Sequence, residues 1–272
     1  MQDQPFNFEE LAAQLGLDLT KPNVARCYDA AFGGQFNSAV DRAVEVRGRE
    51  LFPNLNLFAR MARDYYLHIS DEIARLDATI HHFIDLGSGL PTQGALHERL
   101  PATAQVLYND HDPEVITLSR YIIGDNPNLR YVQCKIEETD AILGAAEEFF
   151  GQERCVCITM LGVAYFIDDA TLTRIIQQFY DWSAPDSRLA VSFFDTNEHD
   201  PAWAEVVETY KKMGVDLYPR SPEQMLRLLG GWQPDDDGIQ PIEVFVERRL
   251  NRTLVDPAMR GKIGFAGIFR RP

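Results

Sequence analysis

A short apolar run that ends in an acid and opens onto a glycine turn constrains the fold of this chain more than any other feature. Residues 83–85 form the run, Gly87 and Gly89 frame the turn, and Asp110 follows 21 residues after Gly89. In a βαβ unit, a buried strand carries the chain to one edge of a sheet, and glycines let the backbone pass close to a ligand. An acid at the end of the second strand can then hold ribose hydroxyls. The spacing therefore predicts a nucleoside site on a parallel sheet.

The turn lacks one feature of dinucleotide sites. Such sites place a third glycine three residues after the second, where the pyrophosphate packs on the start of a helix. Thr92 stands at that position and Pro91 precedes it. Nicotinamide cofactors are therefore disfavoured, and adenosine alone is favoured.

The charge balance limits which partners the chain can have. The chain has 41 acids and 26 bases, a formal net charge of −15, which repels phosphate backbones and anionic lipid surfaces. The sequence has no cluster of five or more Lys or Arg residues, so we expect neither a nucleic acid nor a membrane partner. Residues 1–5 lack the basic and apolar regions of a signal peptide, and no stretch approaches the length that spans a bilayer. These features predict a cytoplasmic protein.

Cysteine and histidine patterns do not predict a metal site. The four cysteines suit a reducing compartment, and Cys155 and Cys157 would point to opposite faces of a strand. The six histidines lack the spacing or carboxylate pairing that metal ligation shows. His111 alone follows the acid at the end of the second strand, where we expect the cofactor.

From about residue 80 onward, strand and helix patterns alternate. This alternation predicts an α/β fold with a doubly wound, mostly parallel sheet of seven strands. Two β-rich runs close the chain without an obvious helix between them, so the last strand is expected to return antiparallel. The expected strands are residues 81–86, 105–109, 129–134, 154–161, 188–194, 242–248 and 263–270, and the expected helices between them are residues 91–100, 113–123, 137–150, 168–182 and 201–213.

The first 78 residues have a different pattern, in which helical periodicity is broken by prolines and a double glycine. Ligands of α/β sheets bind outside the carboxyl ends of the strands, so a helical extension over that edge would cover the ligand. We therefore predict a helical cap, or lid, over residues 1–78 and a nucleoside-binding domain over residues 79–272. Alternatively, these helices cover a sheet face or mediate formation of a homodimer. The expected helices are residues 8–15, 24–32, 38–51 and 55–76.

The sequence resembles the bacterial S-adenosyl methyltransferase family over nearly its whole length. The most specific part of the resemblance is an N-terminal series of polar residues and glycines, and residues 85–92 and 110–113 resemble the two cofactor motifs of the family. The resemblance implies the class I methyltransferase fold, with S-adenosylmethionine (SAM) as cosubstrate or sole substrate and no metal. The residues of the N-terminal series are Pro22, Asn23, Ala25, Arg26, Tyr28, Asp29, Gly33, Gly34, Asn37, Asp41 and Arg42.

The resemblance also implies roles for individual residues. Gly87 and Gly89 would lie against SAM, and Asp110 would hold its ribose. Asp85 would stand near the amino acid end of SAM. Arg63 would lie under the cap, near the SAM carboxylate.

Two positions depart from the family pattern. Relatives usually end the third strand in an aspartate that reads the adenine amino group, whereas this chain has Lys135. That contact would have to come from Glu137, Glu138 or the backbone, or be lost, and we include Glu137 among the expected SAM-binding residues. Many relatives carry a histidine after the fourth strand, where this chain has Tyr165.

A sulfonium cosubstrate is already an electrophile, so the protein must mainly align a nucleophile with a carbon–sulfur bond and exclude water. The best catalytic candidates are Tyr165 and Ser192, both expected at carboxyl ends of central strands, and Tyr28 from the cap. Phe32 and Tyr65 of the cap are expected to add further aromatic faces. Such faces attract a sulfonium by about 0.5–2 kcal/mol.

The sequence leaves three functions open. The first is methyl transfer from SAM to a small molecule of a specialised (natural-product) pathway, with S-adenosylhomocysteine as the by-product. The second uses SAM alone: its α-amine attacks the γ-carbon, expels methylthioadenosine and closes azetidine-2-carboxylate. Bacterial azetidine-2-carboxylate synthases resemble members of the same broad family. The third is a non-catalytic SAM-binding module, which the intact motifs make the least favoured.

Overall fold

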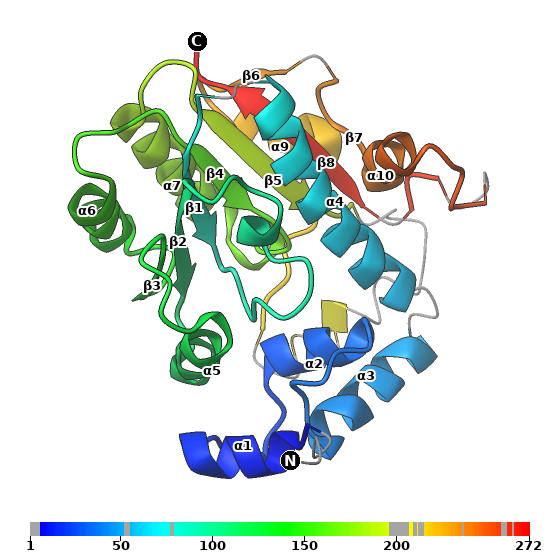
Figure 1. Ribbon diagram of the computed structural model, residues 1–272. Helices are drawn as coiled ribbons and strands as arrows, with labels where there is room; N and C mark the ends of the chain where they lie inside the picture. Colours follow the sequence, from blue (N-terminus) through cyan, green and yellow to red (C-terminus); the bar gives the residue numbers. More distant parts are fainter. Residues whose placement is uncertain are drawn as a thin grey trace.

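The computed structural model has an α/β architecture, with a central sheet and helices on both of its faces (Figure 1). It describes residues 6–51, 55–76, 79–195, 207–208, 211, 215–235, 237–256, 260–262 and 264–272. No helix in this described part is both long and apolar enough to cross a membrane.

Five parallel strands form the centre of the sheet: β1 (His82–Leu86), β2 (Gln105–Asp110), β3 (Leu129–Gln133), β4 (Cys157–Met160) and β5 (Arg188–Phe193). The long β8 (Phe265–Arg270) pairs antiparallel with β5 and with two short strands, β6 (Gln233–Pro234) and β7 (Gln240–Pro241). The strand order is β3-β2-β1-β4-β5-β8-β6. The predicted antiparallel return of the last strand is therefore confirmed. The order reverses between β1 and β4, where sheets of this kind bind ligands.

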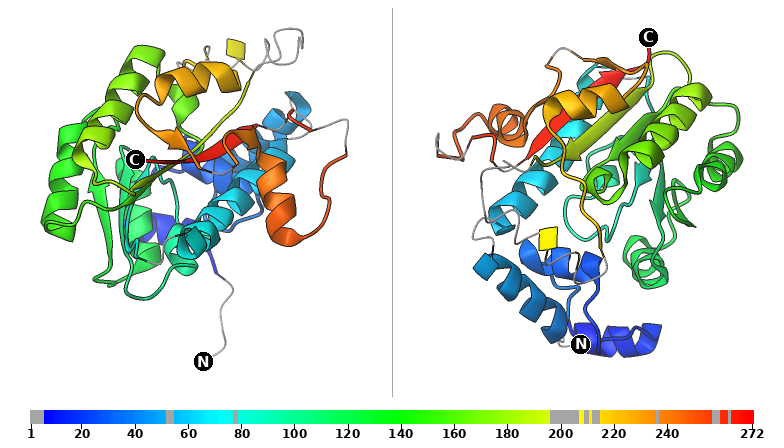
Figure 2. Two further views of the ribbon diagram at one scale, coloured as in Figure 1. Left: turned by 90° about the horizontal axis from the view of Figure 1, so that it is seen from above. Right: turned by 180° about the vertical axis from the view of Figure 1, so that it is seen from behind.

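Apolar side chains alternate between the two faces of the sheet, as the period of a strand requires. Phe83 and Val106 face one side, under α4 (Leu55–Leu76) and α10 (Ile242–Leu250). Ile84 and Leu107 face the other side, under α6 (Thr139–Phe150), α7 (Asp169–Trp182) and α9 (Pro222–Leu228). The view from behind in Figure 2 shows these last three helices covering their face of the sheet. Helices on both faces make the sheet doubly wound.

Three N-terminal helices lie at the end of the molecule where the parallel strands finish (Figure 1): α1 (Phe8–Leu15), α2 (Val24–Ala31) and α3 (Ala39–Leu51). Asn7 and Asn23 begin α1 and α2 as N-caps, because their side chains accept from the first free backbone amides. α1 packs Phe8 and Leu11 against α5 (Pro113–Ile123). The sequence analysis assigned α4 to the cap together with these helices. In the structure, α4 packs along a face of the sheet.

The prediction of a strand at residues 242–248 is wrong, because this segment begins helix α10. Ile242, Phe245 and Val246 are buried, and their spacing is that of one helix face. The helix ends at Asn251, whose backbone is left-handed. A short run rich in β-branched residues fits a strand and a helix equally well, so the sequence pattern alone was ambiguous.

Two further expected helices, at residues 91–100 and 201–213, have different outcomes. The prediction of a helix at residues 91–100 is wrong, because this segment contains the three-residue 3₁₀ helix η1 (Leu96–Glu98) and no α-helix. Gly94 has a φ of 64°, which a right-handed helix cannot contain. The expected helix at residues 201–213 lies mostly outside the described residues.

Candidate active site

The two glycines after β1 hold a turn that other residues would strain. Gly87 and Gly89 have φ values of 63° and 61°, in the left-handed region that favours glycine. A Cβ on Gly87 would lie 2.5 Å from Val163 Cγ1, so a side chain has no room there. A Cβ on Gly89 would lie 3.9 Å from the Cβ of Ala25 in α2. The N-terminal helices therefore come close to the glycine turn.

Asp85, near the end of β1, is buried and accepts two hydrogen bonds. Thr159 of β4 donates its hydroxyl to Asp85 Oδ1 at 2.5 Å, and Tyr66 of α4 donates its hydroxyl to Oδ2. Burial raises the pKa of Asp85 to about 6, although the two hydrogen bonds and the charge of Arg63 act to lower it. The carboxyl group is thus held by two neighbouring elements and titrates close to neutral pH.

Thr159 and Tyr66 are site residues that the sequence analysis missed. Thr159 is the register partner of Asp85 in the pairing of β1 with β4, so the register would have identified it. No local signal distinguishes Tyr66 from Tyr65. The expectation that Tyr65 lines the site is wrong, because Tyr65 is fully buried against Phe245, with ring centroids 5.2 Å apart.

Asp110 ends β2 and joins the second motif to the glycine turn. Its Oδ2 accepts from the amide of Gly89, and its Oδ1 accepts from the amide of Asp112, both at 3.0 Å. His111 Nδ1 lies 3.5 Å from Asp110 Oδ1, and this contact raises the pKa of His111. The side chain of His111 is 71% exposed, so it stands at the rim. The structure therefore brings the glycine turn and the acids of both motifs to one edge of the sheet.

Arg63 of α4 has a buried donor that is not used. Its Cζ lies 4.9 Å from the ring centre of Phe32 and 5.5 Å from that of Tyr66, in the geometry of cation–π contacts. Its Nε is buried and has no hydrogen-bond partner among the described residues. Leaving a buried donor unpaired is unfavourable, and a guanidinium suits a carboxylate well. Arg63 also lowers the pKa of Asp85, so its positive charge acts on this carboxylate. An amino acid ligand has a carboxylate and an ammonium group, and these two groups require a cation and an anion in the binding site.

Tyr28 lies beside Arg63 and joins two helices. Its hydroxyl donates to the carbonyl oxygen of Ala59 at 3.3 Å, and its ring packs against Phe32 with centroids 5.2 Å apart. Burial raises the pKa of Tyr28, so its hydroxyl stays protonated at neutral pH. The predicted cap residue Tyr28 is therefore near Arg63, and its hydroxyl is bonded to the backbone of α4.

Tyr165 and Ser192 meet around Gly162, in the turn after β4. Ser192 Oγ accepts from the amide of Gly162 at 2.9 Å, and the hydroxyl oxygen of Tyr165 lies 3.6 Å from where a Cβ on Gly162 would stand. Val163 of the same turn is the residue that blocks a side chain on Gly87. The turn that carries Tyr165 therefore adjoins the glycine turn. Ser192 uses its oxygen to hold this turn.

A lysine and two glutamates follow the end of β3: Lys135, Glu137 and Glu138. The amide of Lys135 donates to Glu138 Oε2 at 3.0 Å, so Glu138 stabilises the turn. Glu137 is exposed, and its charge contributes to raising the pKa of His111 after the larger effect of Asp110. The side chain of Glu137 is thus near the second motif, and its contact with adenine stays a prediction.

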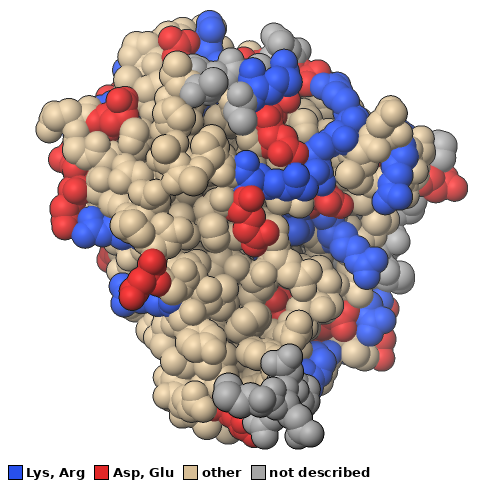
Figure 3. Space-filling model, in the orientation of Figure 1, with Lys and Arg blue, Asp and Glu red and all other residues tan. Residues whose placement is uncertain are grey.

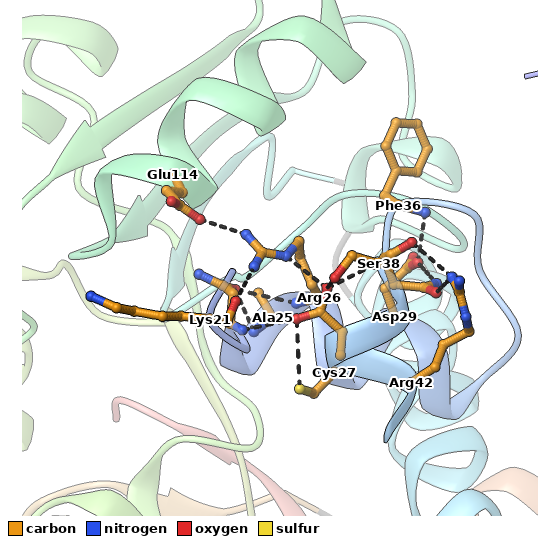
Figure 4. A network of polar contacts seen from close by, with 12 residues as sticks. Lys21, Ala25, Arg26, Cys27, Asp29, Phe36, Ser38, Arg42 and Glu114 are labelled. Carbon is orange, nitrogen blue, oxygen red and sulfur yellow. Dashed lines mark hydrogen bonds and ion pairs between the residues drawn. The ribbon is translucent and has the colours of Figure 1, made fainter. Parts of the chain in front are cut away.

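The N-terminal series of polar residues forms a network inside the cap (Figure 4). Arg26 is 2% exposed, and its Nε lies 2.9 Å from Asp41 Oδ2 while its Nη1 lies 2.5 Å from Glu114 Oε2 of α5. Asp41 also accepts from the amide of Asn23 and from the amide and hydroxyl of Ser38. Although burial acts to raise it, these bonds lower the pKa of Asp41 below its usual value.

Asp29 organises the second half of the same series. Its Oδ2 accepts from the amide of Phe36 at 2.8 Å and from Asn37 Nδ2 at 2.9 Å. A Cβ on Gly34 would lie 2.1 Å from Asp29 Oδ1, so the second glycine of the pair leaves room for this carboxylate. Arg42 donates to Asn37 Oδ1 at 2.9 Å. These residues build the cap, a role that their spacing in the sequence did not reveal.

Two further observations help to delimit the site. The described part of the chain has no group of three or more His, Cys, Asp or Glu residues that could hold a metal. A cavity of about 190 Å³ lies elsewhere, lined by His68, Phe245 and Arg248 among others and by none of the motif residues. In Figure 3, basic and acidic side chains gather on the right half of the view, where Figure 1 shows α4 and α10. The surface over α4 and α10 therefore carries charges of both signs.

The fold and the site together define a class of protein. A glycine turn after β1, an acid at the end of β2 and an antiparallel last strand are the parts of a Rossmann-like nucleoside-binding domain of the class I methyltransferase type. The chain belongs to the S-adenosyl methyltransferase family, whose model matches residues 10–270. SAM, as cosubstrate or sole substrate, is therefore the molecule that this chain uses, and the predicted fold class is confirmed.

Two solved structures are similar over nearly their whole length. One is a candidate methyltransferase from Thermobifida fusca, which is 28% identical, with a TM-score of 0.82 over 94% of this chain and 97% of the other. Another is a DUF574 family protein from Streptomyces avermitilis, 22% identical, with a TM-score of 0.81 over 94% of this chain and 99% of the other. The second likeness concerns the fold alone. The search among curated protein sequences found no match.

Proposed function

We propose that the protein transfers the methyl group of SAM to a small-molecule acceptor. The observation that carries this proposal is the pair of opposite charges on Arg63 and Asp85 beside the glycine turn. Arg63 offers an unused donor to a carboxylate, and Asp85 offers an acceptor to an ammonium group. These are the two charges at the amino acid end of SAM. Asp110, bonded to the same turn, offers oxygens to the ribose hydroxyls.

SAM supplies an electrophilic methyl group when bound, so the protein has to hold and align rather than to activate. Arg63 and Asp110 would fix the two ends of the cosubstrate. Tyr165, in the turn beside Gly87, would turn its ring toward the sulfonium, an attraction of about 0.5–2 kcal/mol. The acceptor's nucleophile would form a bond to the methyl carbon opposite the sulfur, and the electron pair of the broken bond would leave on S-adenosylhomocysteine.

The acceptor is proposed to be a small molecule. The net charge of −15 disfavours nucleic acids, and helix α2 comes close to the glycine turn, which limits the room for a macromolecule. A specialised pathway, a cytoplasmic location and a homodimer remain predictions from the sequence.

Cyclisation of SAM is the second candidate, and the state of Asp85 favours it. Burial raises the pKa of Asp85 to about 6, which suits a general base at neutral pH. Asp85 would take the proton that the α-ammonium group of the substrate loses. The freed nitrogen pair would form the bond to the γ-carbon, and the pair of the γ-carbon–sulfur bond would leave on methylthioadenosine. The other product would be azetidine-2-carboxylate.

One incubation separates these functions. The purified protein is mixed with methyl-labelled SAM, alone and with a small-molecule extract, and the products are identified by mass spectrometry. Transfer of the label to an extract compound, together with S-adenosylhomocysteine, supports methyl transfer. Methylthioadenosine and azetidine-2-carboxylate formed from SAM alone would establish cyclisation instead. SAM that binds without being consumed in either mixture indicates a binding module, and absence of SAM binding by calorimetry contradicts all three functions.

A further inference from the structure

We propose that Asn23 and Arg26 are positioning residues, which hold the ribose-binding carboxylate of Asp110 in place from the cap. They act through Asp112 and Glu114, at the start of helix α5. The inference rests on the proposed function, because it gives Asp110 the ribose of SAM as its ligand. Its consequence is that docking of the cap and binding of SAM strengthen each other.

Asn23 is the N-cap of its own helix and also contacts the N-cap residue of a second helix. Its Oδ1 accepts from the amides of Ala25 and Arg26 at 2.9 and 3.2 Å, which begins α2. Its Nδ2 donates to Asp112 Oδ2 at 2.5 Å. Asp112 is in turn the N-cap of α5, because its Oδ1 accepts from the amide of Glu114 at 2.8 Å. One hydrogen bond thus joins the N-caps of two helices that are 89 positions apart.

Arg26 holds the first turn of α5 from the same side (Figure 4). Its Nη1 lies 2.5 Å from Glu114 Oε2, while Glu114 Oε1 accepts from the amide of Asp18 at 3.0 Å. Arg26 is almost fully buried, and Asp41 fixes its other side through Nε. Both oxygens of Glu114 are therefore bonded to the cap. Charge-assisted bonds with a buried partner are stronger than exposed ion pairs.

The contacts of Asn23 with Asp112 and of Arg26 with Glu114 form a joint between the cap and α5. Asp110 is connected to this joint through the backbone. The amide of Asp112 donates to Asp110 Oδ1 and the amide of Gly89 donates to Oδ2, both at 3.0 Å. Oδ1 also lies 3.5 Å from His111 Nδ1. Each carboxylate oxygen can accept a second bond, so Oδ2 stays available to a ribose hydroxyl. A chain of two hydrogen bonds, from Asn23 to Asp112 and from Asp112 to Asp110, therefore reaches the ligand-binding group from the cap.

This arrangement requires a reciprocal effect. If docking of the cap stabilises the orientation of Asp110 that binds ribose, then SAM on Asp110 stabilises the docked cap by the same factor. Loosening the joint should lower SAM affinity although the changed residue is assigned no contact with SAM. Bound SAM should likewise slow amide hydrogen exchange in α2.

The sharpest test is Asn23→Asp, with Asn37→Asp as the matched control. An aspartate at position 23 still caps α2, but it loses the donor to Asp112 and adds a like charge there. In Asn37→Asp the same substitution is placed beside Asp29, inside the cap. We expect Asn23→Asp to weaken SAM affinity about tenfold and Asn37→Asp to change it by less than about threefold, measured by calorimetry.

A rescue experiment separates positioning from a general loss of structure. Adding Asp112→Asn to Asn23→Asp restores one donor and one acceptor across the joint, and asparagine remains a good N-cap. The double variant should regain SAM affinity to within about threefold of wild type. It should also regain the SAM-induced slowing of exchange in α2 that Asn23→Asp loses.

Three results would overturn the inference. They are an unchanged affinity in Asn23→Asp, an equal loss in Asn23→Asp and Asn37→Asp, and a double variant that binds no better than Asn23→Asp. Failure of the proposed function is recognised separately, because the wild-type protein itself would then not bind SAM.

Discussion

Replacing Arg63 by methionine tests where the amino acid end of SAM binds. Methionine keeps an unbranched apolar side chain between the rings of Phe32 and Tyr66, so packing is largely retained and the charge is lost. A hydrogen bond to a charged group contributes about 1.5–3 kcal/mol. Losing the bond to the SAM carboxylate should therefore weaken SAM affinity about 10- to 150-fold.

The same substitution should also act through Asp85 and depend on pH. Arg63 lowers the pKa of Asp85, so its removal should raise that pKa above the wild-type value of about 6. A larger fraction of the carboxyl group is then protonated at neutral pH and cannot pair with an ammonium group. The affinity of both proteins should fall as the pH falls, and in the variant this fall should begin at a higher pH.

The assay is calorimetry of SAM binding across the neutral pH range for wild type, Arg63→Met and Arg60→Met. Arg60 is the control, because it lies on the same helix and is exposed. We expect wild-type affinity in the control. An Arg63→Met protein that binds SAM as tightly as wild type would refute the assignment, and a loss that is equal at every pH would refute the link to Asp85.

Three further predictions concern other residues. Asp110→Ala should weaken SAM affinity at least about tenfold in calorimetry, because a charge-assisted bond is lost, and an unchanged affinity would contradict the ribose assignment. Tyr165→Phe should keep most of the turnover rate, whereas Tyr165→Ala should lower turnover by about 2- to 30-fold without abolishing SAM binding; equal rates in the alanine variant and wild type would exclude the proposed role. Asp85→Asn should stabilise the SAM-free protein above about pH 6 by up to about 3 kcal/mol, because the buried carboxyl's pKa is raised from 3.8 to about 6. This gain in unfolding free energy should shrink as the pH falls and vanish below pH 3.8. Denaturant titrations of both proteins at several pH values test this, and a difference in stability that is constant with pH would contradict it.

The centre of the fold could be predicted because its elements carry their own signals. Strands β1, β2, β4 and β5 each contain a short, buried apolar run. Helices such as α5 and α7 begin at an aspartate that caps them. The segment at residues 242–248 carries no such signal. Its apolar residues fit both periods, and burial of Ile242 and Phe245 against the core decides for a helix.

Site residues could be predicted from the sequence where the order of strands along the chain determines their position. They could not be predicted where the packing of helices determines it. Asp85 and Asp110 follow from their places at strand ends, which parallel strands bring to one edge. Tyr66 could not be selected, because adjacent residues of a helix point about 100° apart and only the docking of α4 decides which one faces Asp85. The bond between Asn23 and Asp112 likewise depends on how two distant helices pack.

Under the proposed function, helix α4 would connect the stability of the core with the binding of SAM. Ile69 and Ile73 are fully buried and fix the helix on the sheet, while Arg63 and Tyr66 bring their polar groups to the site. The position of α4 on the sheet therefore determines how the guanidinium and the carboxylate of Asp85 stand relative to each other. An unpaired buried donor on Arg63 and a buried carboxyl on Asp85 both lower the stability of the free protein. A ligand with a carboxylate and an ammonium group relieves both at once, so a site of this kind should favour an intact amino acid end over a ligand that lacks either charge.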